Sequence, residues 1–175
     1  MLRSTVILGD ELPVLQPLAA RDEVTSAVSP GSDHHPPRSA RAVVIGLDLQ
    51  DSASVRDAKR HLREVVRRSL SAVRRYPALA HLFVIYVIPA TVHPDRLSSL
   101  AGSVASRLHA ALERETGQYV DVTLVDATAC RDSALLADRL ADRISEKAGL
   151  HTDIALEWAD IRDRSIQRAT LDQYT

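Results

Sequence analysis

Ala42-Val43-Val44-Ile45-Gly46-Leu47 is the stretch that decides the fold, because it is a continuous apolar run of the length of a β-strand. A run of this kind, without polar alternation, is typical of a strand that is covered on both faces. A second run extends from Leu82 to Ile88 and is rich in β-branched and aromatic residues, which favour strands. We therefore expect a sheet with these two runs near its centre.

Amphipathic helices are predicted after each of these strands. Ser52 or Ser54 can cap the first helix and Tyr76-Pro77 ends it, whereas the second begins at His93-Pro94-Asp95 and ends at Gly117. Apolar residues recur in both helices mostly at steps of three and four, which places them on one face of each helix. These residues are Val55, Ala58, Leu62, Val65, Val66, Leu70 and Val73 in the first helix, and Leu97, Leu100, Val104, Leu108 and Leu112 in the second.

The rest of the chain continues the alternation of strands and helices. Residues Tyr119 to Val125 alternate between apolar and polar, which predicts a third strand with one face in water and a place nearer the sheet edge. A third helix is expected from about Asp132 to Ala148, where Gly149 ends it. Residues 154–158 alternate in a short fourth strand, and a terminal helix is expected over Ile161 to Ala169.

This order of elements predicts an α/β fold. The alternation in the last two strands favours helices gathered mainly on one face, and hence a two-layer α/β sandwich of about four strands with amphipathic helices. A doubly wound, three-layer sheet of the flavodoxin or universal-stress-protein kind is the alternative, because the same order produces parallel crossovers.

One α/β domain is expected over residues 41–169, with a short tail at residues 170–175. Residues 1–40 contain prolines 13, 17, 30, 36 and 37 with only short apolar stretches between them, which predicts a mostly disordered, Pro-rich leader. Thr5 to Leu8 could still add an edge strand. His34 and His35 lie in this leader, and without a third ligand nearby we interpret them as solvated linker residues.

The composition argues against several classes of partner. The formal net charge of −1 gives no overall basic excess that would favour nucleic acid or an anionic membrane. No apolar run approaches the roughly 20 residues that span a bilayer. The single cysteine, Cys130, cannot form an internal disulfide, which favours a reducing, cytoplasmic location. Its place just before a helix suits packing better than nucleophilic chemistry.

The search for a cofactor or metal site leaves one candidate, Asp48. The glycines after residue 40 stand at positions 46, 102, 117 and 149 and form no glycine-rich loop for a phosphate. Asp48 ends the first strand, where ligands of α/β sheets commonly bind, so it is a candidate metal ligand. Asp51 is near in sequence, and Asp126 would approach if the first and third strands were adjacent. The alternative interpretation treats these three as strand-end and helix-cap residues.

The first helix has a strongly basic composition. The possible interaction face consists of Arg56, Lys59, Arg60, Arg63, Arg67 and Arg68, opposed on the helix only by Asp57 and Glu64. A functional interpretation has this face dock on an acidic partner, on nucleic acid phosphates or on a nucleotide. The interpretation we favour is a solvated face balanced by acidic residues elsewhere. No aromatic residue lies in the run, so a stacking platform for single-stranded nucleic acid is missing.

Residues 41–168 as a whole resemble the class III adenylate/guanylate cyclase-homology domains of actinobacterial regulators. The resemblance rests on residues 42–49, on the arginine-rich helix and on residues 83–97, and in outline on residues 120–125, 134–140 and 153–160. It implies that Asp48 matches the family's metal-binding aspartate. The family's second metal aspartate lies in a hairpin before the strand Leu82 to Ile88, and residues 76–81 leave no room for that hairpin. The asparagine and arginine of its transition-state motif also have no clear counterparts, so the resemblance implies that two-metal catalysis is lost.

Three hypotheses on function follow. The first is a non-catalytic, cyclase-like module that needs no cofactor and works through self-association as a homo-oligomer, or through a regulatory protein partner. The alternative is a small-ligand or nucleotide-binding domain of the universal-stress type. The third is an active nucleotide cyclase. Only the cyclase and nucleotide hypotheses require Mg²⁺ or Mn²⁺.

Overall fold

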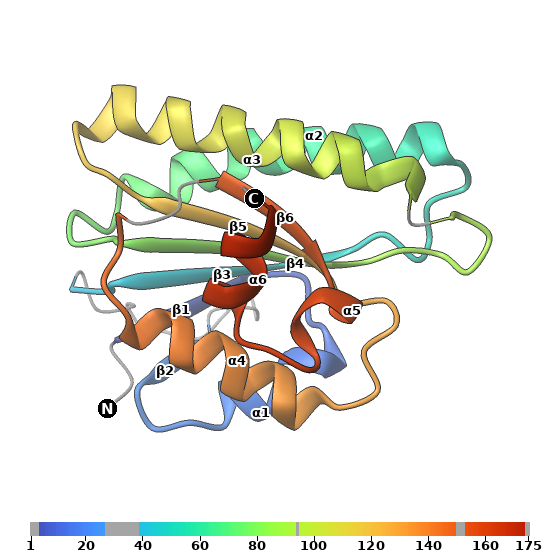
Figure 1. Ribbon diagram of the computed structural model, residues 1–175. Coiled ribbons are helices and arrows are strands. Elements are labelled where there is room, and N and C mark those ends of the chain that lie inside the picture. The colour runs from blue at the N-terminus through green and yellow to red at the C-terminus, as the bar shows by residue number, and fades with distance from the viewer. Residues whose placement is uncertain (1–3, 27–38, 94, 150–152, 174–175) are drawn as a thin grey trace.

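The protein is built on one parallel β-sheet of six strands in the order β2-β1-β3-β4-β5-β6 (Figure 1). The computed structural model describes residues 4–26, 39–93, 95–149 and 153–173. All the strand pairs in this part of the chain are parallel. The strands are β1 (Thr5–Gly9), β2 (Val24–Ser26), β3 (Ala42–Asp48), β4 (His81–Val87), β5 (Asp121–Asp126) and β6 (Asp153–Glu157).

Helices cover both faces of the sheet, and each face has its own apolar core (Figure 1). One face is covered by α2 (Val55–Val73) and α3 (Asp95–Thr116). The other carries the 3-10 helix η1 (Pro13–Leu15), α1 (Gln16–Ala19), α4 (Ser133–Ser145), α5 (Trp158–Ile161) and α6 (Ile166–Gln173). The predicted α/β class is confirmed. The layering is that of the doubly wound, three-layer alternative, with six strands rather than the two-layer sandwich of about four.

The segment expected to be a disordered leader contributes two strands and two short helices. β1 lies inside the sheet between β2 and β3, and Thr5 to Gly9 pair in register with Ala42 to Gly46. The prediction is therefore wrong for residues 4–26, because β1 is stabilised by pairing that a local pattern of five residues does not display. Residues 27–38, with His34 and His35, lie outside the described residues. At the other end, α6 continues to Gln173, four residues past the predicted end of the domain.

The third predicted strand lies next to the edge strand, as expected, but it has no face in water. β5 lies between β4 and β6, and its whole length is buried, including the polar residues Asp121 and Thr123. Asp121 is buried because Arg143 of α4 lies 2.7 Å from it, Nη2 to Oδ2, which compensates the loss of water. Half-buried alternation is found in the edge strand β6 instead. Trp158 begins α5 rather than extending that strand.

None of the described helices is long and apolar enough to cross a membrane.

Candidate functional site

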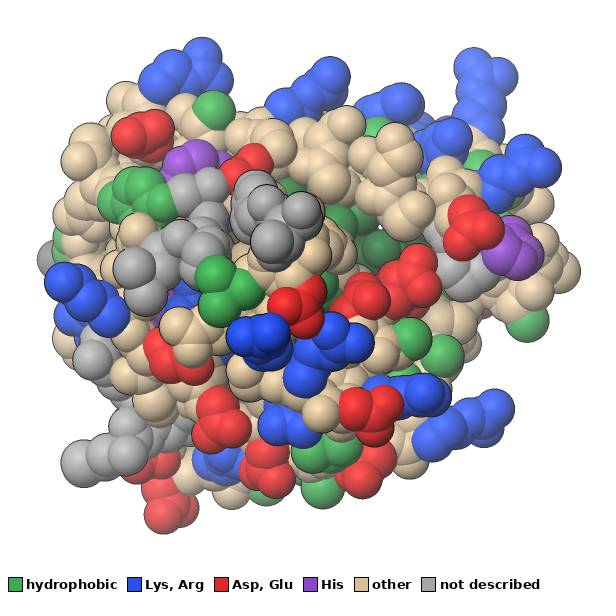
Figure 2. All heavy atoms as spheres, viewed as in Figure 1, with side chains coloured by type: hydrophobic (Ala, Val, Ile, Leu, Met, Phe, Trp, Pro, Cys, Tyr) green, Lys and Arg blue, Asp and Glu red, His purple; other side chains and the backbone are tan. Residues whose placement is uncertain are grey.

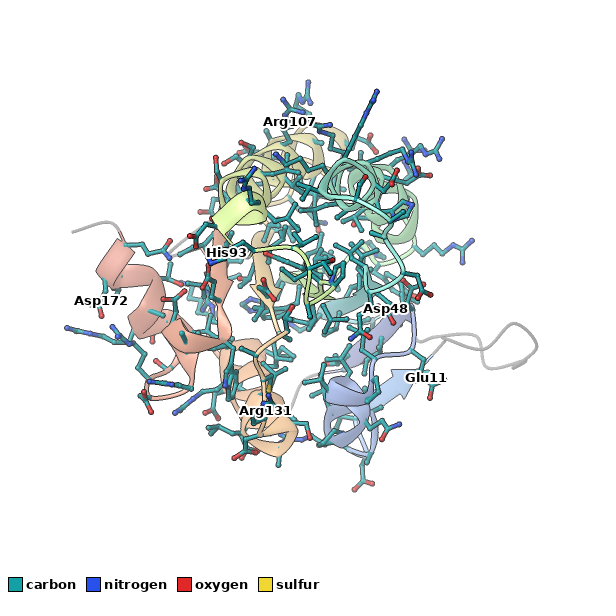
Figure 3. The ribbon with its side chains drawn as sticks, turned by 90° about the vertical axis from the view of Figure 1, so that its right-hand side faces the viewer. Glu11, Asp48, His93, Arg107, Arg131 and Asp172 are labelled. Atoms are coloured by element: carbon teal, nitrogen blue, oxygen red, sulfur yellow. The ribbon has the colours of Figure 1, made fainter. Side chains whose placement is uncertain are left out.

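The carboxyl ends of the strands lie at one end of the sheet, and Figure 3 looks directly onto this end. After β1 the chain enters η1 and α1 on one face, whereas after β3 it enters α2 on the opposite face. The connections on either side of the β1–β3 pair therefore diverge. In open parallel sheets this divergence opens a crevice at the carboxyl ends of the strands, where ligands bind.

Two glycines allow β1 and β3 to end in close contact. Gly9 has a φ of +88°, and a Cβ added to it would lie 2.3 Å from the Gly46 carbonyl oxygen. A Cβ on Gly46 would lie 2.3 Å from the carbonyl oxygen of Asp10. The Asp10 amide donates to the Gly46 oxygen at 2.9 Å, so the chain leaving β1 is bound directly over the end of β3. Side chains at either glycine would push this connection away from the crevice.

A groove of about 550 Å³ opens beside these connections, on the face of the sheet that carries α4. Its size is in the range of small-molecule sites, about 300–1,000 Å³. Apolar side chains, among them Leu12, Val87 and Ala127, form part of its lining, and polar groups stand around them. The polar lining comes from Glu11, Asp48, Gln50, Thr128, Cys130, Arg131 and Ser133.

The groove has charges of both signs, and they come from different loops. Glu11 and Asp48 follow or end β1 and β3 on one side of the groove, whereas Arg131 lies on the other side, just before α4 (Figure 3). Thr128 is fixed at the floor, because its hydroxyl accepts from the Ile88 amide at 2.9 Å and its own amide donates to Asp126 at 2.9 Å. The groove thus combines apolar side chains with two carboxylates on one side and one guanidinium on the other.

Asp48, the predicted metal ligand, is exposed at the end of β3 and bonds to the backbone. Its Oδ1 accepts from the Gln50 amide at 2.8 Å, and its own amide donates to Asp10 Oδ2 at 2.9 Å. On its other side it borders a smaller hollow of about 190 Å³ together with Asp10, His61 and Glu64. Across the described ranges, however, no three His, Cys, Asp or Glu side chains are arranged to hold a metal ion. A metal role for Asp48 stays a prediction.

Asp126 does not approach Asp48, contrary to the sequence-based hypothesis of adjacent strands. β4 lies between β3 and β5, so the two aspartates stand two strand spacings apart, or about 10 Å. Asp126 is paired in register with Tyr86 of β4, whereas Asp48 is paired with Val87, so successive positions direct the two carboxylates to opposite faces.

Cys130 lines the groove without the features of a nucleophile. Burial raises the pKa of its thiol, and the Sγ donates to the Asp132 carbonyl oxygen at 3.4 Å. A nucleophilic cysteine needs a lowered pKa. The geometry agrees with the interpretation of Cys130 as a packing residue.

The basic face of α2 is present on the surface. Arg56, Arg60, Arg63 and Arg67 are exposed and follow one another at steps of four, three and four residues, which sets them in one stripe along the helix. Arg60 pairs with Asp57, and Arg67 with Glu64. Lys59 is half-buried, and the side chain of Arg68 lies outside the described part of the structure.

Sequence reasoning found Asp48 and the basic face but missed most of the groove. Glu11 was assigned to the leader, and Gln50 and Arg131 have no motif around them. The sequence signal that Gln50 and Arg131 share is their position, because both lie in connections that directly follow strands. The hairpin that the cyclase resemblance implies has no counterpart, because residues 74–80 lead directly from α2 into β4 and every described pairing is parallel. Comparison with protein families, with curated proteins and with solved structures finds no match for this chain.

Proposed function

We propose that the protein is a small-ligand-binding α/β domain whose site is the groove between the ends of β1, β3 and β5. The observation that carries the proposal is the coincidence of a groove of about 550 Å³ with the point where the connections after β1 and β3 diverge. Slots of this size, with an apolar floor and a few converging polar groups, are the usual form of small-molecule sites.

The lining limits the ligand to a compact polar molecule. Glu11 and Asp48 offer carboxylate oxygens that accept hydrogen bonds, so they suit hydroxyl or amino groups on the ligand. Arg131 on the opposite wall suits one carboxylate or one phosphoryl group. A polyphosphate fits poorly, because the connections after β1 and β3 bring acidic side chains and no glycine-rich loop. Nucleosides and nucleoside monophosphates are the largest ligands that this lining favours.

A thermal-shift screen of the full chain tests this proposal. The panel contains nucleosides, AMP, ATP, GTP, cyclic AMP, cyclic GMP, hydroxylated sugars and amino acids, each with and without Mg²⁺. A ligand at about 100 times its dissociation constant stabilises the folded state by roughly 2.7 kcal/mol, which is easily seen as a rise in Tm. Titration calorimetry then measures the affinity of any compound that raises Tm.

A pair of glutamine substitutions supplies the control. Gln50→Trp fills the mouth of the groove from an exposed position, and Gln118→Trp places the same ring at an exposed position near the start of β5, at the opposite end of the sheet. We expect the first variant to abolish binding and the second to leave it unchanged. Equal binding by both variants, or no binding by any compound in the panel, would contradict the proposal.

A second function, docking on an acidic protein surface through α2, is supported by the stripe Arg56, Arg60, Arg63 and Arg67. This second function corresponds to the hypothesis of self-association or of a regulatory protein partner, since the acidic surface belongs either to another copy of the chain or to a different protein. Sedimentation at low and at high salt separates these cases: self-association through the stripe should weaken with salt and disappear in Arg56→Glu/Arg63→Glu. An unchanged sedimentation coefficient in that variant argues against self-association through α2.

A further inference from the structure

The charged side chains around the groove do not neutralise one another. Glu11 and Arg131 are exposed on opposite sides of it, and within the described residues neither side chain makes a hydrogen bond or an ion pair. Asp48, on the same side as Glu11, accepts from the Gln50 amide at 2.8 Å and has no cationic partner among those residues. Charges of opposite sign therefore flank one groove and remain available to a ligand.

The order of the strands sets the distance between these two sides. Asp48 ends β3 and is paired in register with Val87 of β4, which lines the groove. Arg131 belongs to the connection after β5, the neighbour of β4 on its other side. Two strand spacings are about 10 Å, and a hydrogen bond of about 2.9 Å at each end leaves roughly 4 Å between the charged groups of a ligand. A ligand that reaches both sides therefore has its charges at the two ends of a short chain.

The polarity of the two sides decides which end of a ligand binds where. Arg131 and Ser133 lie at the amino end of α4, which favours a negatively charged group. Asp132 lies between them in sequence, but it caps the helix, accepting from an amide of the first turn at 2.9 Å, and it does not line the groove. On the other side, Glu11 and Asp48 attract a cation and repel an anion.

We propose that the groove binds an aliphatic molecule with a carboxylate at one end and an ammonium group at the other, as in ω-amino acids and lysine. This inference rests on the ligand site proposed above and narrows its chemistry. The carboxylate binds Arg131 and the ammonium group binds Glu11 and Asp48 through charge-assisted hydrogen bonds, while the chain between them lies over Val87 and Ala127. A phosphomonoester fits less well, because it brings negative charge to a groove with two carboxylates and one guanidinium.

The probe is 5-aminopentanoate, and its controls are pentanoate and pentylamine, which each keep one charged end on the same carbon chain. Titration of the full chain at low salt, followed by heteronuclear NMR, measures weak affinities and shows which backbone amides respond. Binding of 5-aminopentanoate should saturate and shift the amides of residues 11–14 and 128–133, on the two sides of the groove. Each one-ended analogue should bind about tenfold more weakly or worse, the loss expected for one hydrogen bond to a charged group.

Two substitutions test the orientation of the ligand, because each removes one charge from one side of the groove. Arg131→Gln should weaken 5-aminopentanoate and pentanoate about tenfold and leave pentylamine unchanged. Glu11→Gln should weaken 5-aminopentanoate and pentylamine by a smaller factor, since Asp48 remains, and leave pentanoate unchanged. Both side chains are exposed and unbonded within the described residues, so neither change should disturb folding.

The outer surface of α2 and α3 supplies the control for unspecific attraction of the carboxylate. Figure 2 shows Lys and Arg side chains along the top of the molecule, where Figure 1 places these two helices. Arg107 of α3 is exposed on this side, on the opposite face of the sheet from α4 (Figure 3). Arg107→Gln removes the same charge as Arg131→Gln and should leave the affinity for 5-aminopentanoate unchanged.

Several outcomes would overturn the proposal. These are equal affinity for 5-aminopentanoate and its one-ended analogues, equal effects of Arg131→Gln and Arg107→Gln, and unchanged binding of 5-aminopentanoate in Gln50→Trp. If a sugar or a nucleotide binds to the native chain but not to Gln50→Trp, and 5-aminopentanoate does not bind, the groove is still a ligand site and only the ligand class proposed here is wrong. If no compound binds, both proposals fail.

Discussion

Replacement of Arg143 by methionine should remove a large share of the stability of the folded protein. The Arg143 side chain is 4% exposed, and its guanidinium lies 2.7 Å from the Asp121 carboxylate, Nη2 to Oδ2, and 2.8 Å from Glu146, Nη1 to Oε2. Asp121 itself is buried and also accepts from the Gly149 amide at 3.2 Å. Methionine fills most of the space but leaves the Asp121 charge buried without this counter-charge.

The loss is expected to be about 3–5 kcal/mol, the usual cost of breaking a buried ion pair by removing one partner. Against a total stability of roughly 5–15 kcal/mol, a loss of this size is at least about a fifth of the total. For a chain of this length, each kcal/mol corresponds to about 2–4 °C, so Tm should fall by roughly 6–20 °C. Urea unfolding followed by the fluorescence of Trp158, the single tryptophan, measures the free energy directly.

Arg164→Met is the matched control. Arg164 Nη1 lies 2.7 Å from Asp172 Oδ2, the same distance as in the buried pair, but both side chains are exposed, at 48% and 37%. Exposed pairs contribute about 0–1 kcal/mol, so this variant should remain close to the native chain. Asp121→Asn combined with Arg143→Met removes both charges and should recover part of the loss. Equal costs for the two arginine substitutions would refute the reasoning that burial decides the energy.

The other predictions concern single positions. Gly46→Ala should destabilise the folded state by about 1–3 kcal/mol in urea unfolding, because its Cβ would lie 2.3 Å from the Asp10 carbonyl oxygen. Gly102→Ala is the control: a Cβ at this position in α3 meets no atom within 4 Å, so the variant should be more stable by roughly 0.5–1 kcal/mol. If Gly46→Ala were instead the more stable variant, the close approach at Gly46 would be relaxed at little cost in free energy. Cys130 should react with a disulfide reagent at pH 7 more slowly than free cysteine, since burial raises the pKa of its thiol. An equal or faster reaction would contradict the raised pKa. The raised pKa of Glu157 means that the folded chain binds its proton more tightly than the unfolded chain, so the stabilisation is present at low pH and is lost as the pH rises through that pKa. Urea unfolding of Glu157→Gln should therefore show a smaller decline in stability than the native chain between about pH 4 and pH 7, and parallel declines would argue against the shift.

The central part of the fold was predictable because its signals are local. The apolar runs of β3 and β4 and the periodic stripes of α2 and α3 each show their structure within their own residues. β1 could not be predicted with the same security, because five residues followed by acidic residues and prolines become a strand only when β3 is beside them. Its position inside the sheet depends on contacts with residues more than thirty positions away along the chain.

The errors at β5 and at the site share a physical cause. Asp121 and Thr123 indicate a wet face because polar residues usually lie in water, yet a buried guanidinium satisfies the first of them. Asp48 and Asp126 were found through their places at strand ends, but their separation depends on the order of strands, which no residue pattern displays.

The insertion of β1 between β2 and β3 decides how fragments of this protein will behave. A fragment that starts at residue 40 keeps both long helices and four strands, but it loses the neighbour that pairs with the backbone of β3. The amide and carbonyl groups of Val43 to Ile45 would then form an open edge beside apolar side chains, which is a template for intermolecular pairing. Such a fragment is expected to precipitate or to form β-rich aggregates, and expression, labelling or fusion at the N-terminal side should leave Thr5 to Ser26 intact.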